Sequence, residues 1–540
     1  MKKINKNGHK FIVFLVLISF LPLFVTCGGP SEEASRPQEP SIPPNTYTYT
    51  VIYDKNAADA TGTMENSAFT IGQGGTLRIN NFERNNCIFL GWTITAVNKT
   101  VDYTDGQNIN INLTTAGKTI TLYAVWREQY TVIYDKNAVD ATGTMENSTF
   151  TIGTSETLRI NNFERDNCIF LGWTKTSTNK TVDYTDGQSV NNLTTTGKTI
   201  TLFAVWQETY TVEVTAGSTL QDKFTWITNN VESYTTYIIY VISDNYLNSQ
   251  NLTYGAKRNV TIHLKGTGNI TNNSSSLLFK VNSGITLILD GNITLLSNSG
   301  YGMINVSGGF FIMNGGKISG NKYNNTVNVE AGSFTMNGGE ISSNGGSSVV
   351  SVRGIFTMNG GEISDNMGGG GGVSVSGTFI MNGGKISGNI SNNYGGGIFV
   401  SGTFIMNGGE ISGNTAKSGG GVYFSDGTFT MNNGEIAGNI AIDGSGGGVC
   451  VVWVWNNSNR LTFKKIGGTI TGSNSLNGNI IKDSLDNIVN NKGRAVFVSY
   501  PYNTLINEKR KETTAGTGEN LSFSCVSQGV EPTWSGAWDY

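Results

Sequence analysis

The sequence predicts an all-β protein dominated by a right-handed parallel β-helix, preceded by two small β modules. A phrase of the type FIMNGGKISGN occurs six times, with successive methionines 22 to 25 residues apart. Earlier in the chain, a longer segment occurs twice at an offset of 81 residues. Short repeats that combine strand-type alternation with glycine corners are typical of stacked β-coils. The six methionines are Met313, Met336, Met358, Met381, Met406 and Met431.

Alternation inside each short repeat identifies the buried face of a coil. Phe334 and Met336 share one parity, and Thr335 and Asn337 share the other. A second strand with an inward isoleucine follows the Gly-Gly corner, and a third strand of the type VSVSG completes the unit, so we expect three strands and three corners in each coil of about 22–25 residues. Glycine and asparagine tolerate positive φ best, which suits them to the corners.

One asparagine column recurs at the turn that ends the second strand of each coil. Asparagines held in register can form amide ladders along the stack. About ten coils are expected between Val260 and Tyr500, giving a rod of ~50 Å from the strand spacing. The column consists of Asn321, Asn344, Asn366, Asn389, Asn414 and Asn439.

The N-terminus has the pattern of a processing segment. Residues 1–26 combine a basic start with a 15-residue apolar stretch, which predicts a signal peptide. The sequence LFVTCGGP around Cys27 resembles the lipobox of bacterial lipoproteins, which implies lipid attachment at Cys27; an ordinary cleaved signal peptide is the alternative. Residues 27–46 hold five of the eight prolines, which favours an extended tether.

The two modules are expected at residues 47–127 and 128–207. They share TVIYDKNA, FLGW and a closing TITLYAVW or TITLFAVW, with Trp92 matching Trp173. These segments resemble the internalin-type B-repeat (Listeria–Bacteroides repeat), which implies a compact ubiquitin-like β fold used in stalks or adhesive modules. Cys87 and Cys168 stand where that family commonly has an aromatic. We expect each to be a small core residue, with a disulfide between the modules as the alternative.

Residues 208–540 are expected to form the β-helix with its end caps. DKFTWITNN, YIIYVISDN, RNVTIHLKGTGNI and GITLILDGNITLL are expected to be its opening coils, less regular because a solenoid end must be capped. Together, the lipobox, the B-type repeats and the MNGG-x-ISGN coils resemble repeat-rich bacterial surface lipoproteins with pectin-lyase-like β-helices.

Composition excludes several classes of function. The 36 basic and 39 acidic residues nearly balance, so nothing indicates nucleic-acid binding. The five cysteines form no CxxC pair and no ligand spacing with the only two histidines, His9 and His263. We therefore expect no metal site and no cofactor.

The sequence offers no credible catalytic group, and we expect a protein that is not an enzyme. Pectin-lyase-like enzymes need clustered carboxylates, whereas the acids of the coils are scattered. The regular charges after the Gly-Gly corner are expected to form a solvated column, although stacked carboxylates in it are an alternative acid–base pair. The scattered acids are Asp290, Asp365, Asp426 and Asp443. The column consists of Lys317, Glu340, Glu362, Lys385, Glu410 and Glu435.

One irregular coil suggests a binding site. Met431 and Lys465 are 34 residues apart, and the extra residues carry Trp453 and Trp455. Insertions on solenoids commonly carry binding sites. The two tryptophans either stack on sugar rings or cover the insertion by packing.

These features predict a lipid-anchored protein of the bacterial cell surface, with an outer-membrane location. Its expected function is non-catalytic attachment to host matrix proteins or polysaccharides, because repeated coils offer the same contacts at a fixed step. A polysaccharide lyase or glycoside hydrolase and a purely structural stalk or coat protein are the alternatives.

Overall fold

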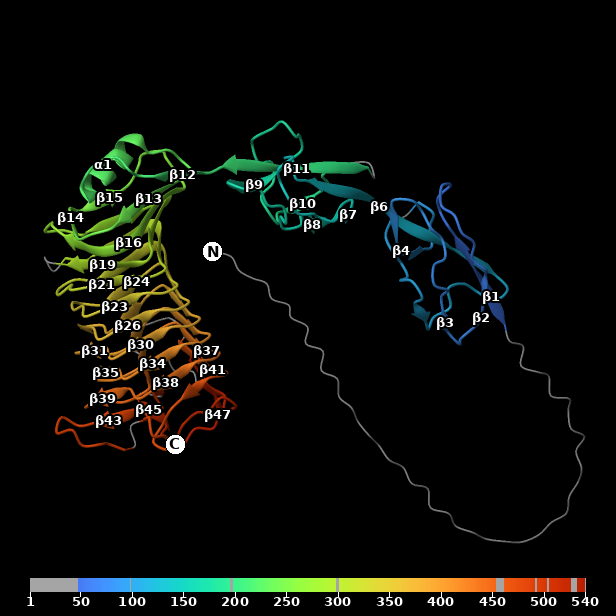
Figure 1. Ribbon diagram of the computed structural model, residues 1–540. Helices are drawn as coiled ribbons and strands as arrows, with labels where there is room; N and C mark the ends of the chain where they lie inside the picture. The colour runs from blue at the N-terminus through green and yellow to red at the C-terminus, as the bar shows by residue number, and fades with distance from the viewer. Residues whose placement is uncertain are drawn as a thin grey trace, which may run out of the picture. The chain divides into compact units, whose positions relative to one another are not determined.

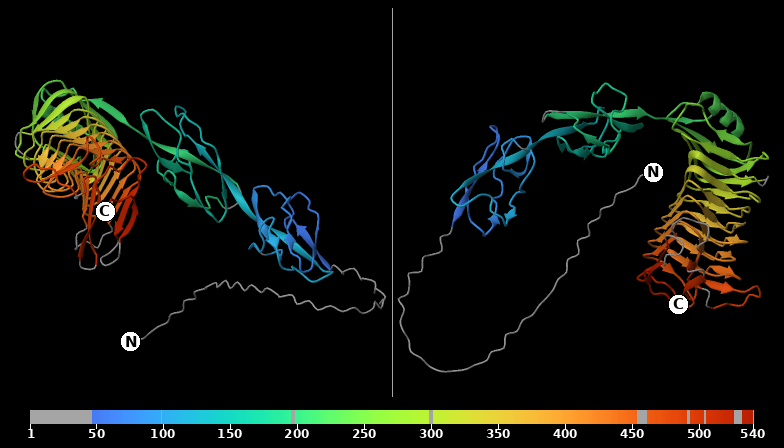
Figure 2. Two further views of the ribbon diagram at one scale, coloured as in Figure 1. Left: turned by 90° about the horizontal axis from the view of Figure 1, so that it is seen from below. Right: turned by 180° about the vertical axis from the view of Figure 1, so that it is seen from behind.

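The computed structural model describes residues 47–539 except residue 98 and the segments 195–197, 298–300, 453–460, 491–492, 503–504 and 526–531. The predicted signal peptide, Cys27 and the tether therefore lie outside the described residues. The all-β class is confirmed, and a parallel β-solenoid of about 10 turns makes up most of the chain. Figure 1 shows these coils stacked from α1 at one end to β47 at the other, and Figure 2 gives two further views.

The first module is a small mixed β-sheet. β1 runs antiparallel to β2 and parallel to the first part of β6, and β4 runs antiparallel to β6. Trp92 is fully buried, with the rings of Tyr53 and Phe89 about 5 Å away. The strands are β1 (Thr48–Asp54), β2 (Ser67–Thr70), β3 (Gly75–Thr76), β4 (Cys87–Thr93), β5 (Asn108–Ile109) and β6 (Thr119–Asp135).

The second module repeats this plan. The second part of β6 runs parallel to β11, and β11 runs antiparallel to β9 around the buried Trp173. The expected boundary after residue 127 falls inside β6. Cys87 and Cys168 are free thiols and only half-buried, and burial raises the pKa of each. The further strands are β7 (Ser148–Thr151), β8 (Ser155–Thr157), β9 (Cys168–Thr174), β10 (Ser189–Asn191) and β11 (Thr199–Glu208).

An α-helix caps the N-terminal end of the β-helix, where an opening coil was expected at DKFTWITNN. α1 (Leu220–Asn230) begins with a capping box between Thr219 and Asp222. Leu220, Phe224 and Ile227 lie on one face at helical spacing and join the core of the β-helix. The expectation was wrong because the segment at each end of a solenoid must cover the open core rather than continue the repeat.

The strands of the opening coils pair in parallel, with β12 before α1 in the chain and the others after it. The lengths of their strands vary widely, from 3 residues in β14 and β15 to 13 residues in β16. They are β12 (Tyr210–Glu213), β13 (Thr235–Val241), β14 (Asn245–Leu247), β15 (Gln250–Leu252), β16 (Val260–Asn272), β17 (Phe279–Asn282), β18 (Ile285–Leu289) and β19 (Asn292–Ser297).

The predicted Phe and Met face is buried along the whole stack. Successive phenylalanines stack at centroid distances of 4.6–5.1 Å, and the methionines pair in register at 0% exposure. The strands that carry this face are β20 (Ile304–Met313), β22 (Val327–Met336), β25 (Ile355–Met358), β29 (Thr378–Met381), β33 (Thr403–Met406), β37 (Thr428–Met431) and β41 (Leu461–Lys465).

The second strand of each coil carries the inward isoleucine and the column of charges. Lys317, Glu340, Glu362, Lys385, Glu410 and Glu435 lie in register, as predicted. The strands are β21 (Lys317–Ser319), β23 (Glu340–Ser342), β26 (Glu362–Ser364), β30 (Lys385–Ser387), β34 (Glu410–Ser412), β38 (Glu435–Ala437) and β42 (Thr469–Ile470).

From Met367 onward the coils hold one more short strand than the three that were predicted. These strands form a separate five-stranded parallel ladder, because the chain stays extended for two or three residues between the asparagine and the next glycine turn. They are β27 (Met367–Gly368), β31 (Ile390–Ser391), β35 (Thr415–Ala416), β39 (Ile440–Ile442) and β43 (Ile480–Lys482).

The remaining strand of each coil has the VxV pattern and closes the core. In the first two repeats it is fused with the Phe and Met strand as β20 and β22. Later it is separate, as β24 (Val350–Val352), β28 (Val373–Val375), β32 (Ile398–Val400), β36 (Val422–Phe424), β40 (Val449–Val452) and β44 (Val496–Tyr502). Antiparallel strands then cap the C-terminal end: β45 (Leu505–Lys511), β46 (Leu521–Cys525) and β47 (Thr533–Gly536).

The predicted asparagine ladder is present and buried. Asn389 donates from Nδ2 to Asn414 Oδ1 at 3.0 Å, and this oxygen also accepts the backbone N–H of Asn389 at 3.0 Å. These asparagines do not take the positive φ expected at corners. The residue before each takes it instead, for example Asp365 at +52° and Gly388 at +62°, because a buried asparagine must keep its own N–H on the ladder.

Candidate functional site

The outward face of the VxV strands changes from polar to aromatic along the stack. Ser351 and Ser374 lie in register with Phe399, Tyr423, Cys450 and Phe497 on successive strands. Tyr423, Cys450 and Phe497 form a buried cluster, and Phe399 packs against this cluster. We call Phe399, Tyr423, Cys450 and Phe497 the aromatic column. The column begins at β32, because the preceding strand β28 has only Ser374 at the equivalent position.

Tyr394 adds an exposed ring beside this column. Its ring lies 4.5 Å from that of Tyr423 at an interplanar angle of 24°, and the ring of Phe399 lies 5.6 Å from Tyr423 at 11°. Tyr394 is 43% exposed and Tyr423 is 8% exposed. Burial raises the pKa of Tyr423. Three nearly parallel rings therefore form one rigid unit with Tyr394 on its outside.

Small-molecule pockets commonly measure ~300–1,000 Å³, and a hollow of ≈ 620 Å³ lies beside these rings. Its lining combines two aromatic rings with small polar residues and bare backbone. The lining residues are Ser347, Gly369, Gly370, Ser374, Asn393, Tyr394 and Phe399. We call this space the aromatic hollow.

Glycine is required at Gly371, which follows the lining residues Gly369 and Gly370 of the aromatic hollow. A Cβ at Gly370 would lie 2.4 Å from Ser348 Oγ, and Gly371 has φ +66° with its Cβ position only 2.1 Å from Gly395 O. The run GGGGG therefore lets neighbouring coils approach closely and keeps side chains out of the space. Chemically, the hollow offers ring faces for stacking and hydroxyl, amide and backbone groups for hydrogen bonds.

Three of the four scattered acids of the coils have separate roles in local structure. Asp290 Oδ2 lies 3.1 Å from His263 Nε2, and Asp290 Oδ1 accepts the N–H of Gly291. Asp426 accepts the N–H of Gly427, and Asp443 accepts the N–H of Ser484. Burial lowers the pKa of His263 more than Asp290 raises it. The structure does not bring these acids together into one site.

The charge column forms ion pairs along the outside of the coils. Lys317 Nζ lies 2.8 Å from Glu340 Oε1, and Lys385 Nζ lies 3.3 Å from Glu410 Oε1. The hydrogen bond from Lys317 lowers the pKa of Glu340. The pKa of Glu410 is also lowered, first by Ser412 and then by Lys385. Both carboxylates are thus held in the ionised form, which does not suit a general acid.

Among the described residues, no group of three or more His, Cys, Asp or Glu side chains is placed to hold a metal ion. No helix in that part of the chain has the length and apolar character needed to cross a membrane. Trp453 and Trp455, the binding residues suggested by the sequence, lie outside the described residues. The strand before them, β40, ends at Val452 and contributes Cys450 to the aromatic column.

Each module carries its own copy of a second hollow. The two hollows measure ≈ 600 and ≈ 590 Å³ and have equivalent linings around the YDKNA segment. In the first module, Asn56 has φ +53° and donates from Nδ2 to the carbonyl oxygens of Ala96 and Ala124 at 3.1 and 3.0 Å. These two hydrogen bonds hold the loop in place, and they use the Nδ2 group of Asn56 for structure.

Comparisons with protein-family models, with curated proteins and with solved structures returned no match for this chain.

Proposed function

We propose that this protein is a lipid-anchored protein of the bacterial cell surface whose β-helix binds glycans without catalysis. The observation that carries the proposal is the aromatic hollow, which is lined by Phe399 and by the exposed ring of Tyr394, itself stacked on Tyr423. A flat ring with a neighbouring polar rim suits a sugar, which has an apolar ring face and hydroxyl edges.

The cellular setting is part of the same proposal and comes from the sequence. Lipid at Cys27 and the tether of residues 27–46 would hold the folded part near an outer membrane, facing host matrix or polysaccharide. The resemblances to internalin-type B-repeats and to pectin-lyase-like lipoproteins support an adhesive function. Replacing Cys27 with alanine is expected to move the protein from the membrane to the soluble fraction. Retention in the membrane would contradict lipid anchoring.

Binding is tested with the full chain carrying Cys27→Ala on an array of polysaccharides and matrix proteins, with calcium present. We expect retention on a polysaccharide without newly released sugar ends. Tyr394→Ala is expected to weaken retention at least tenfold, and Ser374→Phe is expected to do the same by filling the hollow. Tyr323→Ala is the matched control, because Tyr323 is also an exposed β-helix tyrosine (72%) but does not line the hollow.

The other outcomes identify the alternatives. Calcium-dependent release of unsaturated sugar ends would make the protein a polysaccharide lyase, and other new sugar ends would make it a glycoside hydrolase. No retention and no product would favour a stalk or coat protein. Retention that is unchanged by Tyr394→Ala and Ser374→Phe would place the binding site elsewhere, for example at Trp453 and Trp455.

A further inference from the structure

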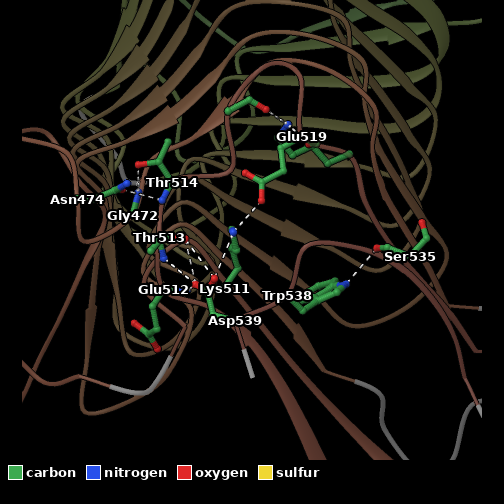
Figure 3. Close-up of polar contacts among 12 residues, drawn as sticks. Gly472, Asn474, Lys511, Glu512, Thr513, Thr514, Glu519, Ser535, Trp538 and Asp539 are labelled. Atoms are coloured by element: carbon green, nitrogen blue, oxygen red, sulfur yellow. Dashed lines mark hydrogen bonds and ion pairs between the residues drawn. The ribbon is translucent and has the colours of Figure 1, made fainter.

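A buried lysine in the C-terminal cap faces two carboxylates. Lys511, the last residue of β45, has a side chain that is only 6% exposed. Its Nζ lies 2.7 Å from Glu519 Oε1 and 3.3 Å from Asp539 Oδ1 (Figure 3). The two acids come from the segment before β46 and the segment after β47. One amine therefore joins three segments of the cap.

The carboxyl group of Asp539 is fixed in one orientation. Its Oδ2 accepts the backbone N–H groups of Glu512 at 2.7 Å and Thr513 at 2.9 Å (Figure 3). Thr513 Oγ1 donates to the same carboxylate at 3.1–3.2 Å. Asp539 Oδ1 is left on the side of Lys511. Two N–H donors aimed at one oxygen are the arrangement that stabilises negative charge during attack on a carbonyl carbon.

Glu519 is the second carboxylate that contacts the amine of Lys511. Burial lowers the pKa of Lys511, but its hydrogen bonds to Glu519 and Asp539 outweigh burial and leave the pKa above its ordinary value. Burial raises the pKa of Asp539, but the N–H bonds of Thr513 and Glu512 together with the contact to Lys511 outweigh that effect and lower the pKa. The resting groups are therefore an ammonium and a carboxylate, and a reaction between them requires transfer of a proton.

We propose that Lys511 and Asp539 condense into an intramolecular amide bond, with Glu519 relaying the protons. The ammonium passes a proton through Glu519 to Asp539 Oδ1, and the free amine attacks Cγ. Charge then develops on Oδ2, where the N–H groups of Glu512 and Thr513 bind it. The nitrogen loses a second proton through Glu519 to Oδ1, the C–O bond breaks, and water leaves. An ammonium and a carboxylate thus become one amide and one water, with no other reactant.

The bond would fasten the cap over the end of the solenoid. Lys511 and Asp539 are 28 residues apart, and the chain between them contains β46 and β47. A covalent link that closes this segment restricts its unfolding. Cap strands are the place where a stack of coils would otherwise open first.

The full chain is purified, its intact mass is measured, and its proteolytic peptides are sequenced by mass spectrometry. We expect a joined pair of peptides, one with Lys511 and one with Asp539, lighter than their sum by one water. Lys511→Arg keeps the positive charge but is expected to abolish the bond, as is Asp539→Ala. Glu519→Gln is expected to slow bond formation at least tenfold. Lys317 and Glu340 are the internal control, because their ion pair is exposed (37% and 41%) and should stay unjoined.

Separate, unmodified peptides for Lys511 and Asp539 in the parent chain, with an intact mass that does not change after long incubation at neutral pH, would overturn the proposal and leave an ion pair only. A joined peptide that persists in Glu519→Gln at the parent rate would overturn the relay. The result for the parent chain decides the main point even if a variant fails to fold.

Discussion

Lys465 takes the place of Met431 in the next coil of the buried face. The two residues pair in register between β37 and β41, and Lys465 is 1% exposed. Its Nζ donates to the carbonyl oxygens of Gly516 and Glu519, each at 2.7 Å. The methionine column therefore ends in a cation that ties the last coil to the loop leading into β46.

Lys465→Met is expected to leave stability at pH 7 within about 1 kcal/mol of the parent or to raise it, because a buried charge is exchanged for an apolar chain of similar length. Burial lowers the pKa of Lys465 in the folded state, so the lysine of the unfolded chain binds its proton more tightly than the lysine of the folded protein does. The parent therefore gains stability as pH rises from the lowered pKa toward 10.5. Denaturation of both proteins at several pH values should show their difference shift toward the parent as pH rises.

Lys465→Ala is the control for this substitution. It removes the charge as well but leaves a cavity, and it is expected to cost about 2–4 kcal/mol. A Lys465→Met protein that loses as much stability as Lys465→Ala would show that the two carbonyl bonds, rather than packing, hold the loop.

The two asparagine ladders should differ in their contribution to stability. Asn389 is fully buried, and its Nδ2 donates to Ile363 O at 2.8 Å as well as to Asn414. Asn389→Ala leaves buried groups without partners and is expected to cost about 2–4 kcal/mol. Asn382 belongs to an exposed ladder, in which its Nδ2 donates to Asn359 Oδ1 at 2.9 Å, so Asn382→Ala should cost under about 1 kcal/mol.

Amide hydrogen exchange of the coils on either side is the measurement, because a solenoid need not unfold in one step. The Asn389→Ala variant is expected to lose protection of the amides in these coils, whereas the Asn382→Ala variant is expected to keep it. Equal loss for the two variants would mean that burial of the inner ladder adds nothing.

Most of the β-helix followed from periodicity, because stacking identical coils forces equal residues into equal positions. The parity of Phe334 and Met336 identified the core, and the recurrence of Asn389 and its equivalents identified the ladder. The structure at the two ends of the β-helix could not be predicted from this periodicity. α1 breaks the repeat, and its signals were local instead: the capping box at Thr219 and Asp222 and the spacing of Leu220, Phe224 and Ile227.

The candidate site was missed because it depends on register between coils. Phe399 and Tyr423 occupy the polar position of a VxV strand, where the preceding coils have asparagine or serine. That departure is visible in IFV and VYF, but only the pairing of β28, β32 and β36 places Ser374 beside Phe399 and leaves a hollow. Tyr394 comes from a turn whose path the repeat does not predict.

α1 is expected to protect the β-helix from self-association. Phe224 is 1% exposed, and its ring lies 5.8 Å from that of Phe279 in the core. Phe224→Ala is expected to cost about 3–5 kcal/mol locally and to uncover the end of the parallel sheet, which can pair with another chain. Light scattering should detect larger species. Thr225→Ala, on the exposed side of the same helix, should remain like the parent, and a monomeric Phe224→Ala protein would contradict the protective role.

The Lys317–Glu340 pair should make a small contribution to stability that depends on pH. The hydrogen bond from Lys317, followed by that from Ser342, lowers the pKa of Glu340 below its ordinary value of 4.5. A carboxyl group whose pKa is lower in the folded state stabilises the fold at pH values above its pKa in the unfolded state. This stabilisation is lost as the pH falls through the pKa of the folded state. Because both side chains are about two-fifths exposed, the pair should contribute under about 1 kcal/mol.

Lys317→Met is expected to raise the pKa of Glu340 in an NMR titration while the pKa of Glu410, paired with Lys385, stays unchanged. An unchanged pKa of Glu340 would assign the shift to Ser342 instead.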